Sequence, residues 1–343
     1  MFFKKIPKNI KEYHVKSILI IGLGSLGDNL MLTPTIKLIK DTYKKAEIDI
    51  VIGPRALGFA RNNPWFSNIY VWNKKISLNL FTSLRKKRYD IIFDFKNSLL
   101  PFFLRGKYKF TFFIKEFFSD KSFTHESERT IKFVESYFGK PENINLYFPV
   151  LQTDIEKTEK FFKTFGINKS DIIIVMNPGA AFPAKRWKKE NFIQTGKEIL
   201  KIYDAKIIIT GNKLEKSLGE DIKIGINNKN VFNLAGETTI GELAAILKMA
   251  DVLITNDTGT LHLASAVRCP VVVIFGPSNP YRYGPIGTKN YVLHADIDCF
   301  PCKLEAKCNK KFICMEYIYV KDVINAVSIL LNEEKQLHLF EFE

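Results

Sequence analysis

A length of 343 residues with a hydrophobic fraction of 46% is enough for about two globular domains of roughly 150 residues each. The formal net charge of +15 favours an anionic partner, such as a phosphorylated substrate, an acidic membrane surface or nucleic acid. No run of about 18 apolar residues occurs, and the N-terminus lacks an apolar segment of the length that a signal peptide has. We therefore expect a soluble, cytoplasmic protein.

Short β-branched runs alternate with amphipathic segments along the chain, a pattern typical of buried parallel strands that are joined by helices. In the first half, strands are expected at residues 17–22, 47–53 and 89–95. In the second half, strands are expected at residues 171–179, 205–212, 230–236, 251–257 and 270–277, with helices at residues 188–204, 238–250 and 259–267. The sequence therefore predicts an α/β protein.

A polar, charged stretch separates the two strand-rich halves, and we place the domain boundary there, between Val150 and Ser170. An N-terminal domain is expected at residues 1–160 and a C-terminal domain at 161–320. Both are expected to be Rossmann-like α/β/α domains that face each other across a cleft. Residues 321–343 have helical spacing and are expected to form a helix that crosses back to the N-terminal domain.

The first predicted strand runs into a glycine loop with the spacing G-x-G-x-x-G, formed by Gly22, Gly24 and Gly27. This spacing is found in dinucleotide-binding turns, which also need an acid at the end of the second strand to hold the ribose. Here Asp49 lies inside the second strand and Arg55 follows it. An arginine suits a 2′-phosphate, so an NADP-dependent oxidoreductase is an alternative function. Pro34 argues against this alternative, because it makes the segment after the glycines longer than a dinucleotide-binding turn prefers.

The residue after the last glycine, Asp28, suggests a different use of the same loop. The glycines around Ser25 and Leu26 allow a sharp turn at the carboxyl end of the strand, where α/β sheets place their active sites. A carboxylate that projects from this loop suits a general base. The structural alternative is that Asp28 caps the following helix.

Two loops in the second half carry groups that suit an anion. Lys185, Arg186 and Trp187 place two cations and an aromatic side chain before a helix. Thr258 and Gly259 open another helix, whose backbone N–H groups and positive dipole end attract anions. A diphosphate is expected between the loops, with Lys185 as the point charge and Thr258 and the amides of Gly259 and Thr260 as directional donors.

Three other polar residues near these loops have competing interpretations. Asp257 is either part of the site or a turn residue, and His262 is either a site residue or a buried histidine on the helix. Glu242 could hydrogen-bond a ribose, but it also lies three residues after Thr239 in a capping-box pattern that is a sufficient structural explanation.

Four motifs in this order resemble those of glycosyltransferase family 9, the lipopolysaccharide heptosyltransferases, and the resemblance covers nearly the whole chain. The motifs are GLGSLGDNLMLTP (residues 22–34), NPGAAFPAKRW (177–187), LAGETTIGELAAILKMADVLITNDTGTLHLA (234–264) and FGPSNP (275–280). The resemblance implies a GT-B fold, with an N-terminal acceptor-binding domain and a C-terminal domain that binds the nucleotide sugar.

The resemblance also implies an activity: inverting transfer of a heptose from ADP-heptose to an acidic, lipid-linked saccharide of the lipopolysaccharide inner core. Asp28 would be the general base, on an acceptor-side loop with Gly24, Ser25 and Gly27. Lys185, Thr258, Gly259, Thr260 and Glu242 would bind the donor diphosphate and nucleotide, and Asp257 and His262 would touch the donor sugar or shape the loop. No metal would be required at the reacting centre.

Four cysteines are clustered near the C-terminus with the spacing C-x2-C-x5-C-x5-C, at Cys299, Cys302, Cys308 and Cys314. In a cytosolic chain such a cluster is more often a zinc or iron–sulfur site than a set of disulfides. The spacing differs from that of paired C-x2-C knuckles, so a structural zinc, a disulfide and reduced packed thiols all stay open.

Residues 98–123 interleave phenylalanines with lysines and arginines, a composition that suits either an interfacial membrane segment or core aromatics flanked by solvated cations. We expect peripheral contact with the cytoplasmic face of the inner membrane. A third function, a basic nucleotide-sensing or nucleic-acid-binding protein, would follow from charge alone, but the signatures of the known nucleic-acid-binding modules are absent from the sequence. We therefore expect no nucleic-acid partner.

Overall fold

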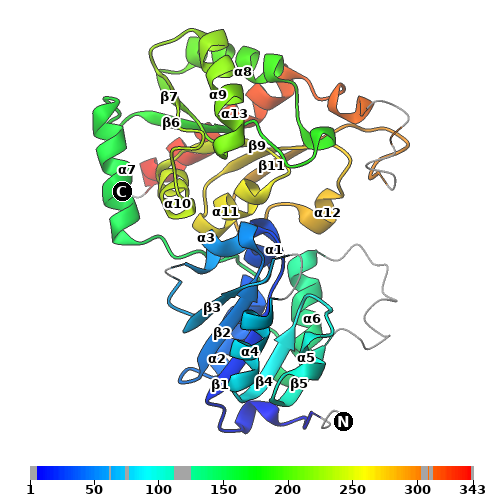
Figure 1. Ribbon diagram of the computed structural model, residues 1–343. Helices are drawn as coiled ribbons and strands as arrows, with labels where there is room; N and C mark the ends of the chain where they lie inside the picture. The colour runs from blue at the N-terminus through cyan, green and yellow to red at the C-terminus, as the bar shows by residue number, and fades with distance from the viewer. Residues whose placement is uncertain are drawn as a thin grey trace. The chain divides into compact units, whose positions relative to one another are not determined.

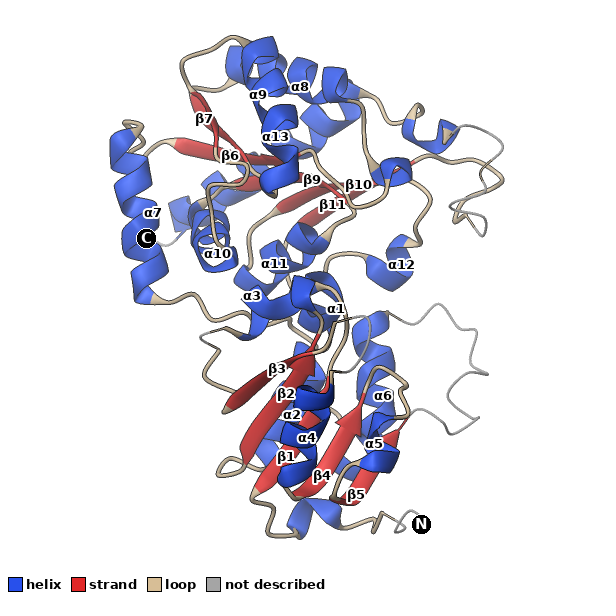
Figure 2. Ribbon diagram, viewed as in Figure 1, coloured by secondary structure: helices blue, strands red, loops and turns tan. Residues whose placement is uncertain are grey.

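The computed structural model describes residues 6–61, 63–73, 77–111, 125–302, 308 and 312–340. The chain divides into two compact units, residues 1–149 and 150–343 (Figure 1). Each unit is a parallel sheet covered by helices on both faces, as the alternation of strands and helices predicts (Figure 2). Among the described residues, none of the helices has both the length and the apolar character needed to cross a membrane.

The first unit contains a five-stranded sheet with the order β3-β2-β1-β4-β5, and all neighbours in it are parallel. Its elements are η1 (Ile10–Glu12), β1 (Ser17–Ile21), α1 (Leu26–Met31), α2 (Thr33–Thr42), β2 (Glu47–Ile52), η2 (Pro54–Ala56), α3 (Leu57–Ala60), β3 (Asn68–Val71), α4 (Leu78–Lys86), β4 (Tyr89–Asp94), α5 (Leu100–Phe103), β5 (Gly106–Thr111) and α6 (Glu126–Phe138).

The two faces of this sheet bury different sets of side chains because neighbouring strand residues point to opposite sides. On one face, Leu19 and Ile92 pack with Leu80 and Leu84 of α4. On the other face, the ring of Phe93 lies against that of Phe138 in α6, which also packs against α2. The result is a three-layer unit whose strands are apolar on both sides.

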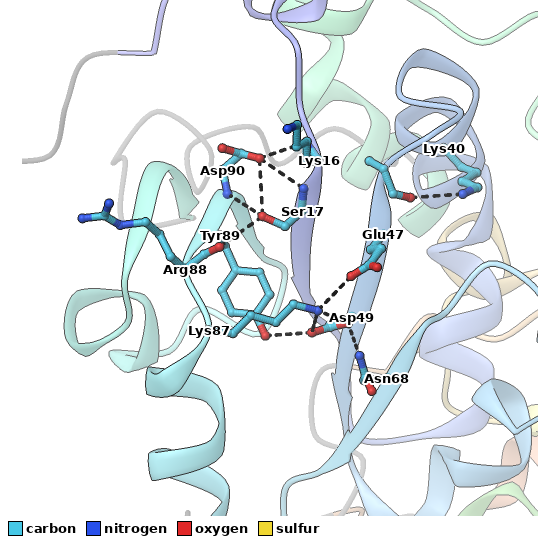
Figure 3. Close-up of polar contacts among 11 residues, drawn as sticks. Lys16, Ser17, Lys40, Glu47, Asp49, Asn68, Lys87, Arg88, Tyr89 and Asp90 are labelled. Atoms are coloured by element: carbon cyan, nitrogen blue, oxygen red, sulfur yellow. Dashed lines mark hydrogen bonds and ion pairs between the residues drawn. The ribbon is translucent and has the colours of Figure 1, made fainter.

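A polar cluster interrupts this apolar interior near the start of β2. Figure 3 shows the carboxylate of Asp49, which is fully buried, together with Lys87, Tyr89 and Asn68. Lys87 Nζ lies 3.0 Å from Asp49 Oδ2, the Tyr89 hydroxyl donates to the same oxygen at 2.9 Å, and Asn68 Nδ2 donates to Oδ1 at 2.9 Å. Burying a carboxylate is costly unless it is paired and hydrogen-bonded, and these partners meet that requirement.

The pKa values of the partners reflect this cluster. Burial lowers the pKa of Lys87, but the hydrogen bonds and the charge of Asp49 and Glu47 outweigh it, so the pKa is raised overall. Burial, followed by the charge of Asp49, raises the pKa of the Tyr89 hydroxyl. Both groups therefore keep their protons in the folded protein, and Asp49 has a structural role in the sheet.

The second unit contains a six-stranded parallel sheet with the order β11-β10-β9-β6-β7-β8. Its elements are α7 (Gln152–Thr164), β6 (Ile172–Asn177), η4 (Pro183–Lys185), α8 (Lys189–Ile202), β7 (Ala205–Ile209), η5 (Lys213–Glu215), α9 (Lys216–Ile226), β8 (Val231–Asn233), α10 (Ile240–Met249), β9 (Val252–Asn256), α11 (Gly259–Val267), β10 (Val271–Phe275), α12 (Pro280–Tyr283), β11 (Asn290–His294), η7 (Ile313–Met315) and α13 (Val320–Phe340).

One face of this second sheet is covered by α8, α9 and α13, whose apolar side chains share a core with the central strands. In α13, Val323, Ala326, Val327, Leu330 and Leu331 are buried in that core. The predicted C-terminal helix is therefore confirmed, and up to Leu331 it packs within the second unit. Its crossing to the N-terminal unit stays a prediction.

Candidate functional site

Each sheet has one place where the strand order reverses, and the candidate residues flank both places. In the first unit the chain builds outwards from β1 through β2 to β3, and then returns to the other side of β1 with β4. In the second unit it builds from β6 through β7 to β8 and returns with β9. Ligands of open α/β sheets bind outside the carboxyl ends of the strands at such a point. The loops that follow β1, β6 and β9 are therefore placed for binding.

The loop after β1 presents Asp28 on the first turn of α1. Ser25 is the cap of this helix: its hydroxyl oxygen accepts a hydrogen bond from the backbone N–H of Asp28 at 3.3 Å. The same hydroxyl donates to Asp28 Oδ2 at 2.6 Å. The interpretation of Asp28 as the cap is therefore wrong. Asp28 is instead a partly exposed carboxylate, held in one orientation by the residue that does cap the helix.

A residue that the sequence analysis did not single out, Asn29, fixes the backbone of this loop. Its side-chain amide donates to the carbonyls of Leu23 and Ser25 at 2.9 and 2.7 Å, and its Oδ1 accepts from the N–H of Leu23 at 3.1 Å. A Cβ on Gly22 would lie 2.6 Å from that Oδ1, so the first glycine makes room for the asparagine. The sequence signal for Asn29 was a polar residue directly before the apolar run Leu30, Met31 and Leu32, and the structure shows that it is fully buried.

Two features of the first unit differ from those of a dinucleotide-binding site. Helix α1 contains the last glycine, Gly27, has only six residues, and is followed by a separate helix, α2, with Pro34 in its first turn. The chain after the glycines is thus divided near Pro34, in agreement with the expected longer segment. Asp49 does not lie at the carboxyl end of β2, and its carboxylate is engaged by Lys87, Tyr89 and Asn68. Asp49 is therefore not available to hold a ribose, whereas Arg55, on which the NADP alternative depends, is exposed in η2 directly after β2.

In the second unit, an asparagine at the end of β9 ties together the two loops expected to hold a diphosphate. Asn256 Oδ1 accepts from the backbone N–H of Trp187 at 3.1 Å, and its Nδ2 donates to the carbonyls of Pro178 and Gly179 at 2.8 and 3.3 Å. Because β6 and β9 are parallel neighbours, their carboxyl ends meet at one edge of the sheet. The expected convergence of these loops is confirmed.

Lys185 and Asp257 meet at this edge. Lys185 Nζ lies 2.7 Å from Asp257 Oδ2, and the two side chains are 20% and 7% exposed, respectively. Thr258 caps α11, since its hydroxyl accepts from the N–H of Thr260 at 3.3 Å. Thr258, Gly259 and Thr260 stay partly exposed. The arrangement offers a cation, a hydroxyl and the N-terminal end of a helix, which together suit a diphosphate.

The other residues near these loops have structural contacts. Trp187 is buried in the core, where its Nε1 donates to the carbonyl of Ile318 at 3.0 Å, so the expectation that it is presented beside the cations is wrong. Arg186 Nε donates to the carbonyl of Ala180 at 2.8 Å and closes its own loop. His262 is buried on α11.

Glu242 belongs to a capping box at the start of α10. Its carboxylate accepts from the N–H of Thr239 at 2.7 Å, and its other oxygen lies 3.2 Å from Lys157 Nζ in α7. Burial raises the pKa of Glu242, but these partners outweigh burial and lower the pKa overall. The capping box is confirmed, and nucleotide binding by Glu242 stays a prediction.

The four clustered cysteines line one small cavity of about 20 Å³. Burial, followed by the nearby thiols of Cys308 and Cys299, raises the pKa of Cys314. Within the described part of the chain, no group of three or more His, Cys, Asp or Glu side chains is arranged to hold a metal ion. The thiols are thus close neighbours without a coordination geometry, and a zinc site stays a prediction.

A model of glycosyltransferase family 9 (heptosyltransferase) matches residues 77–313, more than half of the chain. Lipooligosaccharide heptosyltransferase 2 of Campylobacter jejuni subsp. jejuni serotype O:2 is 28% identical over 325 residues, which span 92% of this chain and 97% of that protein. Lipopolysaccharide heptosyltransferase 2 of Escherichia coli K12 is 26% identical over 310 residues, which span 80% of this chain and 87% of that protein.

Solved structures of the same kind share the fold. Glycosyl transferase family 9 from Veillonella parvula has a TM-score of 0.78 at 23% identity, with 94% of this chain and 99% of that chain covered. The E. coli ADP-heptose lps heptosyltransferase II has a TM-score of 0.74 at 22% identity, with 93% and 100% covered. The expected GT-B class, with two Rossmann-like domains, is confirmed.

The two sheets and these likenesses define a GT-B fold, and the family model and the curated relatives show that the chain is a glycosyltransferase. The family model that matches residues 77–313 narrows the class from GT-B glycosyltransferases to one family. The chain belongs to glycosyltransferase family 9.

Proposed function

We propose that this protein transfers a heptose from ADP-heptose to an acidic, lipid-linked saccharide of the lipopolysaccharide inner core. The names of the relatives support the sugar and the acceptor. The observation that carries the proposal is the grouping of Lys185, Thr258 and the start of α11 at the reversal point of the second sheet. These groups suit the diphosphate of a nucleotide sugar.

In the proposed reaction, an acceptor hydroxyl attacks the anomeric carbon of the donor and the bond from that carbon to the diphosphate oxygen breaks. The Asp28 carboxylate takes the hydroxyl proton, and ADP leaves with the bonding electron pair. Because the hydroxyl enters on the face opposite to the leaving ADP, the anomeric centre is inverted. Lys185, Thr258 and the amides of Gly259 and Thr260 stabilise the charge that develops on the leaving group, so the reaction would require no metal. Glu242 would contact the nucleotide, and Asp257 and His262 the donor sugar or its loop.

The N-terminal unit would bind the acceptor and the C-terminal unit the nucleotide sugar. We propose that the enzyme works at the cytoplasmic face of the inner membrane, where a lipid-linked acceptor is held. The net charge of +15 suits carboxylates and phosphates on that acceptor.

Ligand-induced stabilisation tests the nucleotide. A ligand that binds only the native state at 100 times its Kd stabilises that state by about 2.7 kcal/mol. We expect ADP to raise the thermal midpoint more than NADP does at the same concentration. A larger shift with NADP would contradict the transferase and favour the oxidoreductase. Product analysis by mass spectrometry, after a panel of nucleotide sugars is offered with truncated lipopolysaccharide acceptors, then identifies the sugar.

Metal analysis tests the cysteine cluster separately. Protein purified under reducing conditions would contain about one zinc per chain if the four thiolates bind it, and a chelator would release that zinc together with titratable thiols. Metal-free protein whose thiols titrate without a chelator would contradict the zinc site and leave the proposed transfer reaction unaffected.

A further inference from the structure

A hollow of about 640 Å³ lies in the first unit. It is lined by Trp72 directly after β3, by the start of α4, by the segment between β4 and α5, and by α5 itself. Six of its ten lining residues are apolar or aromatic, and the other four are Ser77, Lys96, Asn97 and Ser98. A mainly apolar lining with one cation suits an apolar guest that carries an anionic group.

The rim of the hollow exposes large apolar side chains to solvent. Leu78 is 75% exposed, Leu99 is 61% exposed and Phe103 is 58% exposed. Phe102 beside them is also exposed. Single exposed apolar residues are common on proteins, but several around one hollow mark a binding surface.

Two cations lie at this surface. Lys96 lines the hollow, and Arg85 lies over the ring of Phe81. Residues 77–111 contain eight lysines and arginines and two aspartates, Asp90 and Asp94. Asp94 is fully buried and accepts hydrogen bonds from the N–H groups of Lys96 and Ser98. The surface therefore combines exposed apolar groups with two cations on a segment that is basic overall.

Lys96 brings a partly buried cation to the wall of the hollow. Its Nζ lies 3.6 Å from the ring centroid of Trp72, a cation–π contact. Burial lowers the pKa of Lys96, and the charge of Asp94 offsets this only in part. An anion beside the ammonium group would compensate for the lost hydration.

We propose that this surface, defined by Trp72, Leu78, Phe81, Lys96, Leu99 and Phe103, docks the first unit on an anionic phospholipid membrane. Apolar side chains enter the boundary between headgroups and acyl chains, while lysines and arginines meet the phosphates. A soluble acidic polymer would satisfy the cations but leave the apolar rim in water. An anionic bilayer satisfies both, and it is also where a lipid-linked acceptor is held.

Vesicle flotation of the full-length protein tests the proposal without acceptor or donor. We expect binding to vesicles of phosphatidylglycerol and phosphatidylethanolamine, weaker binding as salt rises, and little binding to phosphatidylcholine alone. Leu99→Ser combined with Phe103→Ser should lower the partition coefficient by about tenfold or more, because two apolar side chains no longer enter the bilayer. Lys96→Gln should lower it by about fivefold, the loss expected for one cation near an anionic surface.

Matched controls separate docking from misfolding and from the proposed activity. Leu214→Ser removes an apolar residue that is 92% exposed on the second unit and should leave vesicle binding unchanged. The thermal midpoint and its shift with ADP should stay the same in all variants. Equal vesicle binding by the wild type and the Leu99/Phe103 variant would overturn the proposal, as would binding abolished by RNA yet unaffected by that variant. If the Leu99/Phe103 variant loses vesicle binding while the wild type binds vesicles but transfers no heptose, the result supports the docking surface and rejects the transfer function.

Discussion

The two units have the same kind of sheet but place different groups at its reversal point. After β1, the first unit presents the Asp28 carboxylate, oriented by Ser25. After β6 and β9, the second unit presents the Lys185 ammonium, which is paired with Asp257, and the start of α11. The parallel sheet decides where a ligand can bind, and a few loop residues decide whether the place attracts a proton or a phosphate.

A second contrast lies within the first unit, between two aspartates. Asp49 is fully buried and held by Lys87, Tyr89 and Asn68, whereas Asp28 is partly exposed and bonded to a serine hydroxyl. A carboxylate surrounded by its own partners supports the fold, and one that is oriented but accessible can accept a proton from a ligand. The predictions below are ways to break these contrasts.

The largest effect is expected for Asp28→Asn, which removes the proposed base and keeps the size of the side chain. Turnover of ADP-heptose should fall by about 100-fold or more, the range found when a general base is lost. ADP affinity should stay near normal because the nucleotide is proposed to bind the second unit. Steady-state kinetics and calorimetry measure the two effects. Asp41→Asn, on the exposed face of α2 where Asp41 pairs with Lys37, is the control and should be neutral.

The next effect is on folding. Lys87→Met leaves the buried Asp49 carboxylate without its cation, and the free energy of unfolding should fall by about 3 kcal/mol. Urea unfolding measures the loss. Lys37→Met breaks an exposed pair with Asp41 and should cost about 0.5 kcal/mol or less. Equal losses in the two variants would show that Asp49 is not a structural charge.

A smaller effect is expected for Lys185→Ala. ADP affinity should fall by about tenfold or more, because a charge-assisted hydrogen bond to phosphate is lost. Titration calorimetry measures the affinity, with the unliganded thermal midpoint recorded because Asp257 also loses its partner. Lys188→Ala, nearby on the same loop and paired with the exposed Glu316, is the control. Unchanged ADP affinity in Lys185→Ala would remove it from the diphosphate site.

The smallest effect concerns alkaline pH. The pKa of Lys87 is raised in the folded protein above the value of about 10.4 expected in the unfolded chain. The stabilisation by Lys87 is therefore complete below about pH 10.4 and is lost as the pH rises through the folded-state pKa. The stability difference between the wild type and Lys87→Met should shrink in that range. A stability difference that grows with pH would contradict the raised pKa of Lys87. The variant Tyr89→Phe, measured in the same way, separates the contribution of the tyrosine hydroxyl.

The sequence by itself determined the buried strands. All eight expected strands are present, because strands buried on both faces appear as unbroken apolar runs. Three strands, β3, β5 and β11, were not expected from the sequence. Each lies at an edge of its sheet, where one side has no neighbouring strand. Strand β3 has only four residues, and β5 and β11 mix apolar with polar residues. The fourth edge strand, β8, was expected from the sequence, so a position at the edge does not by itself hide a strand.

The sequence also determined which loops carry polar groups, since their residues follow apolar runs directly. Only the tertiary structure decided how those groups are engaged. Ser25 and not Asp28 caps α1, Trp187 turns into the core, and Lys185 meets Asp257 across 72 residues of sequence. These choices depend on distances between segments that no local pattern encodes. The chain order fixes which side chains reach the edge of a sheet, and packing against distant residues fixes which of them stay accessible.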